Sequence, residues 1–414
     1  MDPPVIKVIK FGGTSVGTPA RLKRAARAVQ KQVRKGNGVI VVVSAMGKST
    51  DETLDLINSL KIDISRRATD EILSLGERMS VRMIWALLDA LGVPSRFMDP
   101  AMPEWPIVSN SDFGDAAVDL DATAKKCREH LLPLVEQGVV PVICGFLGRD
   151  PEGRVTTLGR GASDQTAFLL GYCLEADEVL IVTDVEGVMS ADPRIVKNAK
   201  LLDTIYLEEL WDLSVGGARV LNSKALNYKL EKQRARVVHF RSNDINTGGT
   251  EILGATNSEM EITLSEKPVG AVTVVGDRMS RTPGLLAKFA QALTRKRINI
   301  LNISTGSWSI TFFVDYGDSE SAVRALHDSV VLRGGARAVT KGDRCAMITI
   351  AGRELIQTPG VVAGALAPLG ENRVNVIEVS TSKAEITIFV NWKDRQAALK
   401  LIKESLAGLD LGST

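Results

Sequence analysis

The chain has 414 residues, of which 44% are hydrophobic and 24% are charged, a composition typical of a soluble protein with two or three domains. Its net charge of +2 gives no electrostatic reason to expect nucleic acid or an anionic membrane as a partner. No apolar run is long enough to span a bilayer, and the amino terminus does not resemble a signal peptide. Scattered cysteines and histidines predict reduced thiols, a cytoplasmic protein and no zinc site.

The first motif is "VIKVIKFGGTSVG" at residues 5–17, which predicts a short strand followed by a glycine loop and a helix opened by Pro19. A strand, a glycine loop and a helix start together point backbone N–H groups at an anion. From these residues alone, a tight turn that needs positive φ at glycine explains the loop equally well.

Residues up to about 240 alternate apolar strands with helical patterns. Nearly continuous apolar runs at 38–45, 138–146 and 178–184 predict strands buried on both faces of a parallel sheet. Helices are expected at 51–60, 70–91, 116–137, 165–174 and 207–232. We therefore expect a layered α/β domain whose ligand lies at the strand-to-helix loops.

The loop "SAMGKST" at residues 44–50 follows a predicted strand and contains Gly-Lys-Ser, so it is a candidate P-loop. The P-loop pattern requires glycine five positions before Gly47, where this chain has Val42. That interpretation fails, and a polar loop remains in which Ser44 and backbone amides could hold a ligand oxygen.

Three later motifs carry polar groups that local structure does not fully explain. "TTLGRGASD" (156–164) holds Arg160 between two glycines, and helix capping explains only one of the polar residues that follow it. "TDVEGVMSADPR" (183–194) places Asp184 just past a predicted strand, with a carboxylate and a guanidinium on a later turn. "SLGERMS" (74–80) places Glu77 inside an apolar helix, where a ligand role and an ion pair with Arg78 or Arg82 both remain open.

Residues 242–260 are polar and aperiodic, and we interpret them as a linker. Beyond the linker the chain repeats itself: "TPGLLAKFAQALTRKRINILNIST" is echoed by "TPGVVAGALAPLGENRVNVIEVSTS". The offset is constant at 76 residues, as between Thr282 and Thr358 or Phe313 and Phe389. Gap-free identity of this kind indicates a duplicated module, each copy reading as a ferredoxin-like βαββαβ unit.

In order, the motifs "KFGGTSVG", "VVVSAMG", "SLGER", "TTLGRGASD", "TDVEGV" and "ADPRIV" resemble those of the aspartate kinases, in the amino-acid kinase superfamily. The resemblance covers essentially the whole chain. It implies an amino-acid kinase fold, a mostly parallel sheet with helices on both faces, at 1–241. A linker at 242–262 and two tandem ACT modules at 263–340 and 341–414 would follow.

The implied activity is transfer of the γ-phosphate of ATP to the β-carboxylate of L-aspartate, with ATP and Mg²⁺ required. The product, 4-phospho-L-aspartate, begins lysine, threonine and methionine biosynthesis. A carboxylate with a pKa of about 3.9 is ionised at neutral pH, so the nucleophile needs no general base. Catalysis then rests on positioning and on neutralising the charge of the transferring phosphoryl group.

The resemblance also implies residue roles. Lys10 would neutralise phosphoryl charge, with Asp164 and Asp184 orienting Lys10 or the metal–nucleotide, while Arg160 would bind the α-carboxylate of aspartate and Glu77 its ammonium. The other substrate-binding residues would be Thr14, Ser15, Ser44, Gly161 and Ser163. The nucleotide-binding set would be Lys10, Phe11, Gly12, Gly13, Thr183, Asp184, Met189, Asp192, Pro193, Arg194 and Arg219, with Gly12 and Gly13 donating amides.

Three departures from the family pattern stand out. Met189 replaces a usual tyrosine, Ala162 replaces a frequent glycine, and "VLNSKAL" (220–226) replaces "VLHPR". We expect none of them to touch the phosphate- or aspartate-binding residues, so that nucleotide affinity changes and activity is retained.

The ACT modules imply feedback control by an end-product amino acid, bound through Asn375, Val376 and Ser382 where two modules meet, and a homodimer. Arg281 and Leu301 replace acidic residues of lysine-sensitive relatives, so lysine is not the expected effector at the first module. Three alternatives stay open: a kinase of another carboxylate such as N-acetylglutamate, a catalytically silent amino-acid sensor, and ACT modules that serve only dimerisation.

Overall fold

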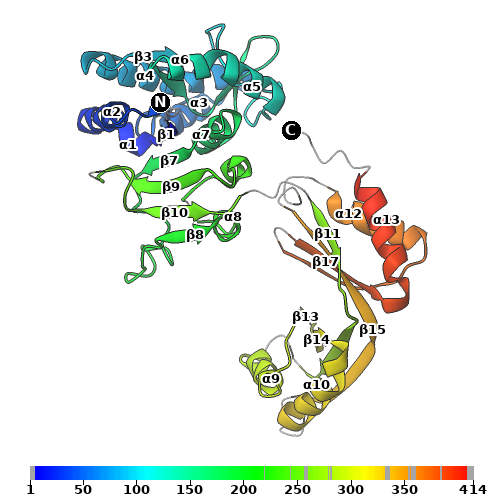
Figure 1. Ribbon diagram of the computed structural model, residues 1–414. Coiled ribbons are helices and arrows are strands. Elements are labelled where there is room, and N and C mark those ends of the chain that lie inside the picture. Colours follow the sequence, from blue (N-terminus) through cyan, green and yellow to red (C-terminus); the bar gives the residue numbers. More distant parts are fainter. Residues whose placement is uncertain are drawn as a thin grey trace. The chain divides into compact units, whose positions relative to one another are not determined.

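The computed structural model forms two compact units, Met1–Thr256 and Asn257–Ser413 (Figure 1). Among the residues that the structure describes, no helix is both long and apolar enough to cross a membrane. The structure describes residues 5–218, 220–242, 244–255, 260–277, 279, 282–331, 336–352, 355, 360–382 and 385–407.

An eight-stranded sheet organises the first unit, in the order β3-β4-β2-β1-β7-β9-β10-β8. The strands from β3 to β9 in that order are parallel, and β10 runs antiparallel to β9. Every residue of β2 and β4 is buried, which confirms that their apolar runs mark strands covered on both faces. The strands are β1 (Ile6–Phe11), β2 (Gly38–Val43), β3 (Ser95–Met98), β4 (Val140–Cys144), β7 (Glu178–Thr183), β8 (Thr204–Tyr206), β9 (Arg234–His239) and β10 (Thr250–Leu253). A separate hairpin pairs β5 (Leu147–Arg149) with β6 (Val155–Thr157).

Helices cover this sheet in two groups, as the predicted layered class requires. Helix α2 packs on α4, α5 packs on α7, and α2, α4 and α7 contact strands of the sheet. The helices are α1 (Gly13–Val16), α2 (Pro19–Arg34), α3 (Ser49–Ser59), α4 (Arg66–Ala90), α5 (Leu120–Lys126), α6 (Leu132–Glu136), α7 (Ala162–Cys173) and α8 (Leu207–Val215). A π-helical turn at Cys127–Leu131 joins α5 to α6.

Two of the secondary-structure expectations for this unit are wrong. The helix expected at 207–232 ends at Val215, because two glycines follow and Gly217 adopts φ +106°; a separate 3₁₀ helix covers Ser223–Tyr228. The segment expected to be a linker contains β10, in which Thr250 and Ile252 are buried in the sheet. A four-residue strand between glycines is too short to show a clear period of two.

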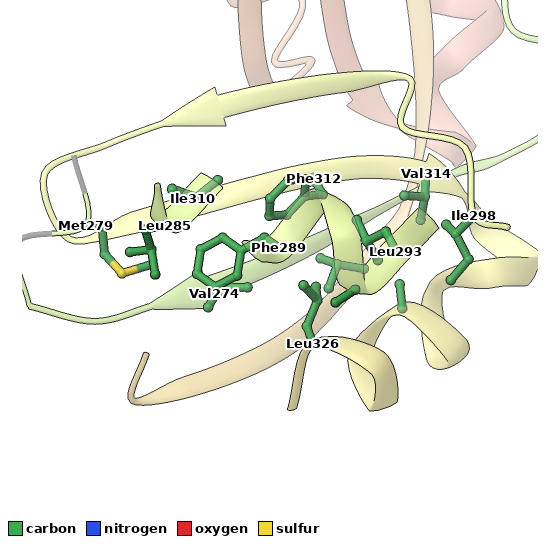
Figure 2. Packing of buried hydrophobic residues seen from close by; sticks show 13 residues of the cluster. Val274, Met279, Leu285, Phe289, Leu293, Ile298, Ile310, Phe312, Val314 and Leu326 are labelled. Atoms are coloured by element: carbon green, nitrogen blue, oxygen red, sulfur yellow. The ribbon is translucent and has the colours of Figure 1, made fainter. Parts of the chain in front are cut away.

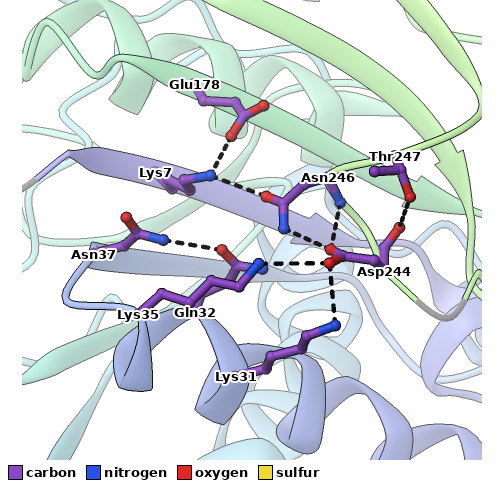
Figure 3. Close-up of polar contacts among 9 residues, drawn as sticks. All are labelled: Lys7, Lys31, Gln32, Lys35, Asn37, Glu178, Asp244, Asn246 and Thr247. Atoms are coloured by element: carbon purple, nitrogen blue, oxygen red, sulfur yellow. Dashed lines mark hydrogen bonds and ion pairs between the residues drawn. The ribbon is translucent and has the colours of Figure 1, made fainter.

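A polar network fixes the loop before β10 to the rest of the unit (Figure 3). Asp244 accepts hydrogen bonds from Asn246 and from Lys31 of α2. Lys7 of β1 bridges Asn246 and Glu178, at 2.9 and 2.5 Å. The backbone N–H of Asn246, with Lys31 adding to it, lowers the pKa of Asp244 below its usual range.

One seven-stranded antiparallel sheet runs through the second unit, in the order β13-β14-β12-β15-β17-β16 with β11 also paired to β15. Its strands are β11 (Glu261–Leu264), β12 (Val269–Val275), β13 (Asn302–Thr305), β14 (Ser309–Asp315), β15 (Ala338–Ala351), β16 (Val376–Thr381) and β17 (Glu385–Asn391). Its helices are α9 (Leu285–Thr294), α10 (Ser319–Leu326), α12 (Val361–Glu371) and α13 (Arg395–Ala407).

Strand β15 belongs to both repeats. Its first half pairs with β12 and completes a βαββαβ unit formed by β12, α9, β13, β14, α10 and β15. Its second half pairs with β17 and with β11, so the second repeat takes its fourth strand from β11, which precedes the first repeat in the chain. The expectation that each copy ends in its own strand is therefore wrong for the second copy, and the expected boundary at 340 falls inside one continuous strand.

Equivalent residues of the two repeats meet at the centre of this sheet. The rings of Phe313 and Phe389 stack with centroids 3.8 Å apart. Val269 pairs with Cys345, whose thiol donates to the Val269 carbonyl at 3.1 Å. Both pairs are separated by the 76-residue offset of the repeat. The duplicated halves thus pack through the same surface of each, as across a two-fold axis.

The core of the first repeat forms between its sheet and helices α9 and α10 (Figure 2). Phe289 and Phe312 pack edge to face with centroids 5.9 Å apart, beside Leu293 and Leu326. These side chains are fully buried, so the amphipathic pattern of the helices places their apolar faces on the sheet.

We expect Phe289→Ala to destabilise the second unit by about 3–5 kcal/mol, because it opens a cavity in a closed core. Leu286→Ala on the same helix, where the side chain is 40% exposed, is the matched control and should cost less than about 1 kcal/mol. Denaturant unfolding of both variants measures the difference. Equal losses of unfolding free energy in the two variants would show that Phe289 does not belong to a closed core (Figure 2).

Candidate functional site

The candidate site lies at the carboxyl edge of the first sheet, where β1 lies between β2 and β7. The chain continues from β1 to β2 on one side and later returns to β7 on the other. Such a reversal of strand order is where open α/β sheets bind ligands. Lys10 is the second-to-last residue of β1, in register with Val42 and Ile181, and therefore lies at this edge.

Lys10 and Asp164 are brought together by the fold. The Lys10 ammonium lies 2.6 Å from Asp164 Oδ1, and both side chains are about nine-tenths buried. Asp164 is in the first turn of α7, where a carboxylate is favoured by the helix dipole. The sequence left open whether Asp164 or Asp184 lies beside Lys10, and the structure pairs Lys10 with Asp164. Among the described residues, the side chain of Asp184 contacts only the Thr183 hydroxyl.

The glycines of the first loop allow another backbone segment to approach closely, and they do not adopt a left-handed conformation. Gly12 adopts φ −67°, and Gly13 is not among the residues with positive φ, so the interpretation as a positive-φ turn is wrong. A Cβ on Gly13 would lie 2.6 Å from the Ala45 carbonyl oxygen and 2.8 Å from that of Gly47. The loops after β1 and β2 therefore touch through bare backbone. Gly12 N–H donates to the Val182 carbonyl at 3.0 Å, so the amide that we expect at a phosphate already has a backbone acceptor in this structure.

Glu77 is a buried carboxylate with one oxygen unpaired. It is 2% exposed on α4, and its Oε1 accepts the Ala45 N–H at 3.2 Å. Its Oε2 has no hydrogen-bond partner among the residues that the structure describes. The ion-pair interpretation is wrong, since Arg78 pairs with Glu71 and Arg82 with Asp99. Burial raises the pKa of Glu77 to about 7, against a smaller lowering by the Ala45 N–H.

The predicted hydroxyls differ in their availability. Ser15 is buried and its hydroxyl donates to the Val182 carbonyl at 3.1 Å, which occupies its proton. Ser163 is buried against Gly145, where a Cβ would lie 2.6 Å from its Oγ. Thr14 follows the glycine loop, in the short helix α1.

Phe11 is the last residue of β1, and Ser44 directly follows β2 beside it. The Ser44 N–H donates to the Phe11 carbonyl at 3.1 Å, which extends the pairing of β1 and β2 by one residue. The Phe11 ring is buried in the core, so only its backbone reaches the edge.

The loop that carries Arg160 is shaped by its two glycines. Gly159 and Gly161 adopt φ +88° and +78°, a conformation that side chains rarely tolerate. The Arg160 side chain is 88% exposed and lies 3.3 Å from Asp51 of α3. The structure therefore does not place its guanidinium against Glu77 or Lys10.

The predicted nucleotide stretch begins at the same edge, where β7 ends at Thr183. Asp192 and Arg194 form a two-pronged ion pair across Pro193, with the closest contact at 2.7 Å. Hydrogen bonds from Arg194 lower the pKa of Asp192 to about 2. Met189 is half-buried and pairs with Leu201. Arg219 lies outside the described residues.

The "VLNSKAL" departure does touch the site, contrary to expectation. The Asn222 N–H lies 3.4 Å from Asp164 Oδ2, and its side-chain amide donates to the Arg160 carbonyl at 2.9 Å. Asn222 also caps the following 3₁₀ helix by accepting from Lys224 N–H. An asparagine before a helical turn is a capping signal, and that signal could have drawn attention to this residue.

Asp70 is a second residue that the sequence did not reveal. It is 1% exposed on α4 and accepts hydrogen bonds from Gly114 N–H and from the N–H and hydroxyl of Thr157, at 2.8–3.0 Å. Burial raises its pKa, while these bonds act in the opposite direction. It anchors the strand that leads into the Arg160 loop. An aspartate in a long amphipathic helix carries no signal of such a role.

In the second unit, the predicted effector residues lie at the two ends of the edge strand β16. Asn375 precedes the strand, Val376 begins it and Ser382 follows it; the first and last are exposed. Leu301 is half-buried against the stacked phenylalanines. Arg281 lies outside the described residues.

Known proteins share both the sequence and the fold. Residues 6–239 match the amino acid kinase family, and residues 272–330 and 341–404 each match an ACT domain. An aspartokinase of Mycolicibacterium smegmatis is 31% identical over 413 residues, covering 96% of this chain and 95% of the relative.

Two solved structures are similar as well. Aspartate kinase from Synechocystis is 28% identical with a TM-score of 0.75, covering 97% of this chain and 69% of that one. Aspartokinase III of Escherichia coli, solved with aspartate and ADP, is 26% identical with a TM-score of 0.55, covering 97% and 100%. The chain therefore belongs to the amino acid kinase family and, within it, to the aspartokinases.

Proposed function

We propose that this chain phosphorylates the β-carboxylate of L-aspartate with ATP, at the edge formed by β1, β2 and β7. The observation that carries the proposal is the buried Lys10–Asp164 pair at the point where strand order reverses. The similarity to an aspartokinase solved with aspartate and ADP supports it.

In this reaction a β-carboxylate oxygen of aspartate forms a bond to the γ-phosphorus, and the bond from that phosphorus to the β,γ-bridging oxygen breaks. The electron pair leaves with ADP, and the product is an acyl phosphate. No proton moves at the nucleophile, because it is already ionised. The protein's task is to align the reactants and to neutralise charge. Lys10 supplies the positive charge, and Asp164 holds its ammonium in place.

Aspartate is zwitterionic, so its recognition needs one anion and one cation from the protein. The unpaired Oε2 of Glu77 is the anion that we assign to the substrate ammonium. Arg160 is the cation for the α-carboxylate, and its exposed side chain can exchange Asp51 for the substrate. Thr14, Ser15, Ser44, Gly161 and Ser163 complete the proposed substrate site.

Magnesium fits this site only as a companion of the nucleotide. Among the described residues, no group of three or more histidine, cysteine, aspartate or glutamate side chains could hold a metal ion. Mg²⁺ commonly binds through nucleotide phosphates with one or two carboxylates, and the exposed Asp184 is the carboxylate offered at this edge. When bound, the ion would neutralise phosphate charge. The remaining nucleotide residues, Phe11 through Gly13, Thr183 and Met189 through Arg194, stay proposed, as does Arg219.

Two alternatives fit the site less well. An N-acetylated substrate has a neutral amide in place of the ammonium, which would leave Glu77 Oε2 buried and unpaired. A silent sensor would have no need of a buried lysine held by a carboxylate at the sheet edge.

We also infer that the ACT modules bind an amino-acid effector between two copies of this chain, in a cytoplasmic homodimer. Asn375 and Ser382 flank β16 and are seven residues apart, which is about 23 Å along a strand. One amino acid cannot touch both within a single chain. Antiparallel pairing of this edge strand with an edge strand of a second copy would bring the ends of two strands together.

Lys10→Met should lower kcat by about 10²-fold or more, because the phosphoryl charge loses its cation. A hydroxamate assay for acyl phosphate, run with aspartate, glutamate and N-acetylglutamate, measures this, and only aspartate should give product. Lys23→Met, on an exposed position of α2, is the control. Lys10→Arg, which keeps the charge beside Asp164, separates loss of chemistry from loss of folding. Acyl phosphate formed only from another acceptor would overturn the proposal.

Glu77→Gln should weaken aspartate binding by about 10-fold or more and remove the pH dependence that Glu77 imposes. Since its pKa of about 7 lies above the ordinary 4.5, the native carboxyl is protonated below pH 7. Aspartate affinity should therefore rise with pH through 7, and binding at pH 6.5 should release a proton. Calorimetry in buffers of different ionisation enthalpy measures both effects.

The raised pKa of Glu77 has a consequence for stability as well. Its stabilising contribution is complete below pH 4.5 and is lost as pH rises through 7, so Glu77→Gln should be more stable than the wild type at pH 8, by about 3 kcal/mol at most. Glu71→Gln, on an exposed turn of the same helix, is the control and should change neither profile. A wild-type affinity that is flat between pH 6 and 8 would refute the role of Glu77.

A further inference from the structure

The Arg160 loop is enclosed by a chain of polar residues that the family motifs do not contain. On one side, the Asp115 carboxylate lies against Gly159, where a Cβ would be 2.2 Å from its Oδ1. On the other side, the Asn222 amide lies against Gly161, where a Cβ would be 3.3 Å from its Nδ2. The space beside each glycine is therefore occupied by a polar side chain, Asp115 or Asn222, and the loop has little room to move sideways.

Lys224 connects the two sides. Its ammonium lies 2.7 Å from Asp115 Oδ1, and its backbone N–H donates to Asn222 Oδ1 at 2.9 Å. The three residues form a continuous polar bridge across the loop, which we call the clasp. Its parts come from positions about 109 residues apart in the sequence, so it forms only in the folded chain.

The clasp contacts the loop at both of its functional ends. Asn222 holds the Arg160 carbonyl at 2.9 Å and approaches Asp164 with its own N–H. The base of the loop is fixed independently, since buried Asp70 binds Thr157 and Gly114. The residue after Gly114 is Asp115, so Asp70 also anchors one end of the clasp.

We propose that Asp115, Lys224 and Asn222 are positioning residues for aspartate recognition, because they hold the backbone from which Arg160 extends. This inference rests on the proposed function. None of the three would touch the reacting atoms. The Lys224 ammonium contacts Asp115 and, among the described residues, neither Asp164 nor the 183–194 stretch. Its loss should therefore raise the KM for aspartate and spare the KM for ATP.

The test compares Lys224→Met with Lys224→Arg in the full-length protein. We expect Lys224→Met to raise the KM for aspartate about 5-fold or more, with the KM for ATP within 2-fold and the melting temperature within about 2 °C. Lys224→Arg keeps the cation and should restore most of the affinity. Arg96→Met is the matched control, because it removes a similarly exposed ion pair, Arg96–Glu104, from the same unit. Asp115→Asn combined with Lys224→Met should be no worse than the worse single variant.

Hydrogen exchange of the 158–164 backbone gives a readout that does not depend on activity, and it should speed up in Lys224→Met and not in Arg96→Met. Unchanged exchange together with an unchanged KM for aspartate would overturn the clasp. So would a loss of affinity for both aspartate and ATP that is accompanied by a lower melting temperature. Failure of the proposed function appears differently. In that case the wild type makes no acyl phosphate from aspartate, while the exchange rates still report whether the clasp holds the loop.

Discussion

The candidate site depends on the contact between two backbone loops at the edge of a parallel sheet. The loop after β1 lies so close to the loop after β2 that a single Cβ on Gly13 would collide with two carbonyl oxygens. This contact fixes the strand end that carries Lys10 relative to Ala45, whose N–H holds Glu77. The cation assigned to the phosphoryl group and the anion assigned to the substrate amine are therefore placed by one constraint. Bare backbone is what permits it.

The two buried charges of the site are treated differently by their surroundings. Lys10 has a carboxylate partner at 2.6 Å, so its charge is satisfied without a ligand. Among the described residues, the Oε2 atom of Glu77 has no hydrogen-bond partner, and burial moves the pKa of this carboxyl to about 7. An unsatisfied buried carboxylate destabilises the free protein, and a protein keeps one where a ligand satisfies it. This imbalance is the observation behind our proposal that the site binds a cationic group.

The second unit shows how a duplication becomes one structure and not two. The repeats share the strand β15, and β11, which precedes the first repeat in the chain, completes the second. Because β15 is a single 14-residue strand, neither repeat can slide along the sheet without the other. The stacked pair Phe313 and Phe389 closes the junction with equivalent residues from each copy. A ligand that changes one repeat therefore acts on the sheet of both.

The sequence by itself determined what depends on short-range pattern. Continuous apolar runs identified the buried strands, the 76-residue offset identified the duplication, and the motif order identified the family. The tertiary structure alone decided which aspartate pairs with Lys10, that Asn222 and Asp70 hold the Arg160 loop, and that β11 joins the second repeat. These contacts join segments that lie far apart in the sequence, as the 62 residues between Asn222 and Arg160 and the 87 between Asp70 and Thr157 show. A contact of that kind leaves no periodicity in either segment, so only the folded chain reveals it.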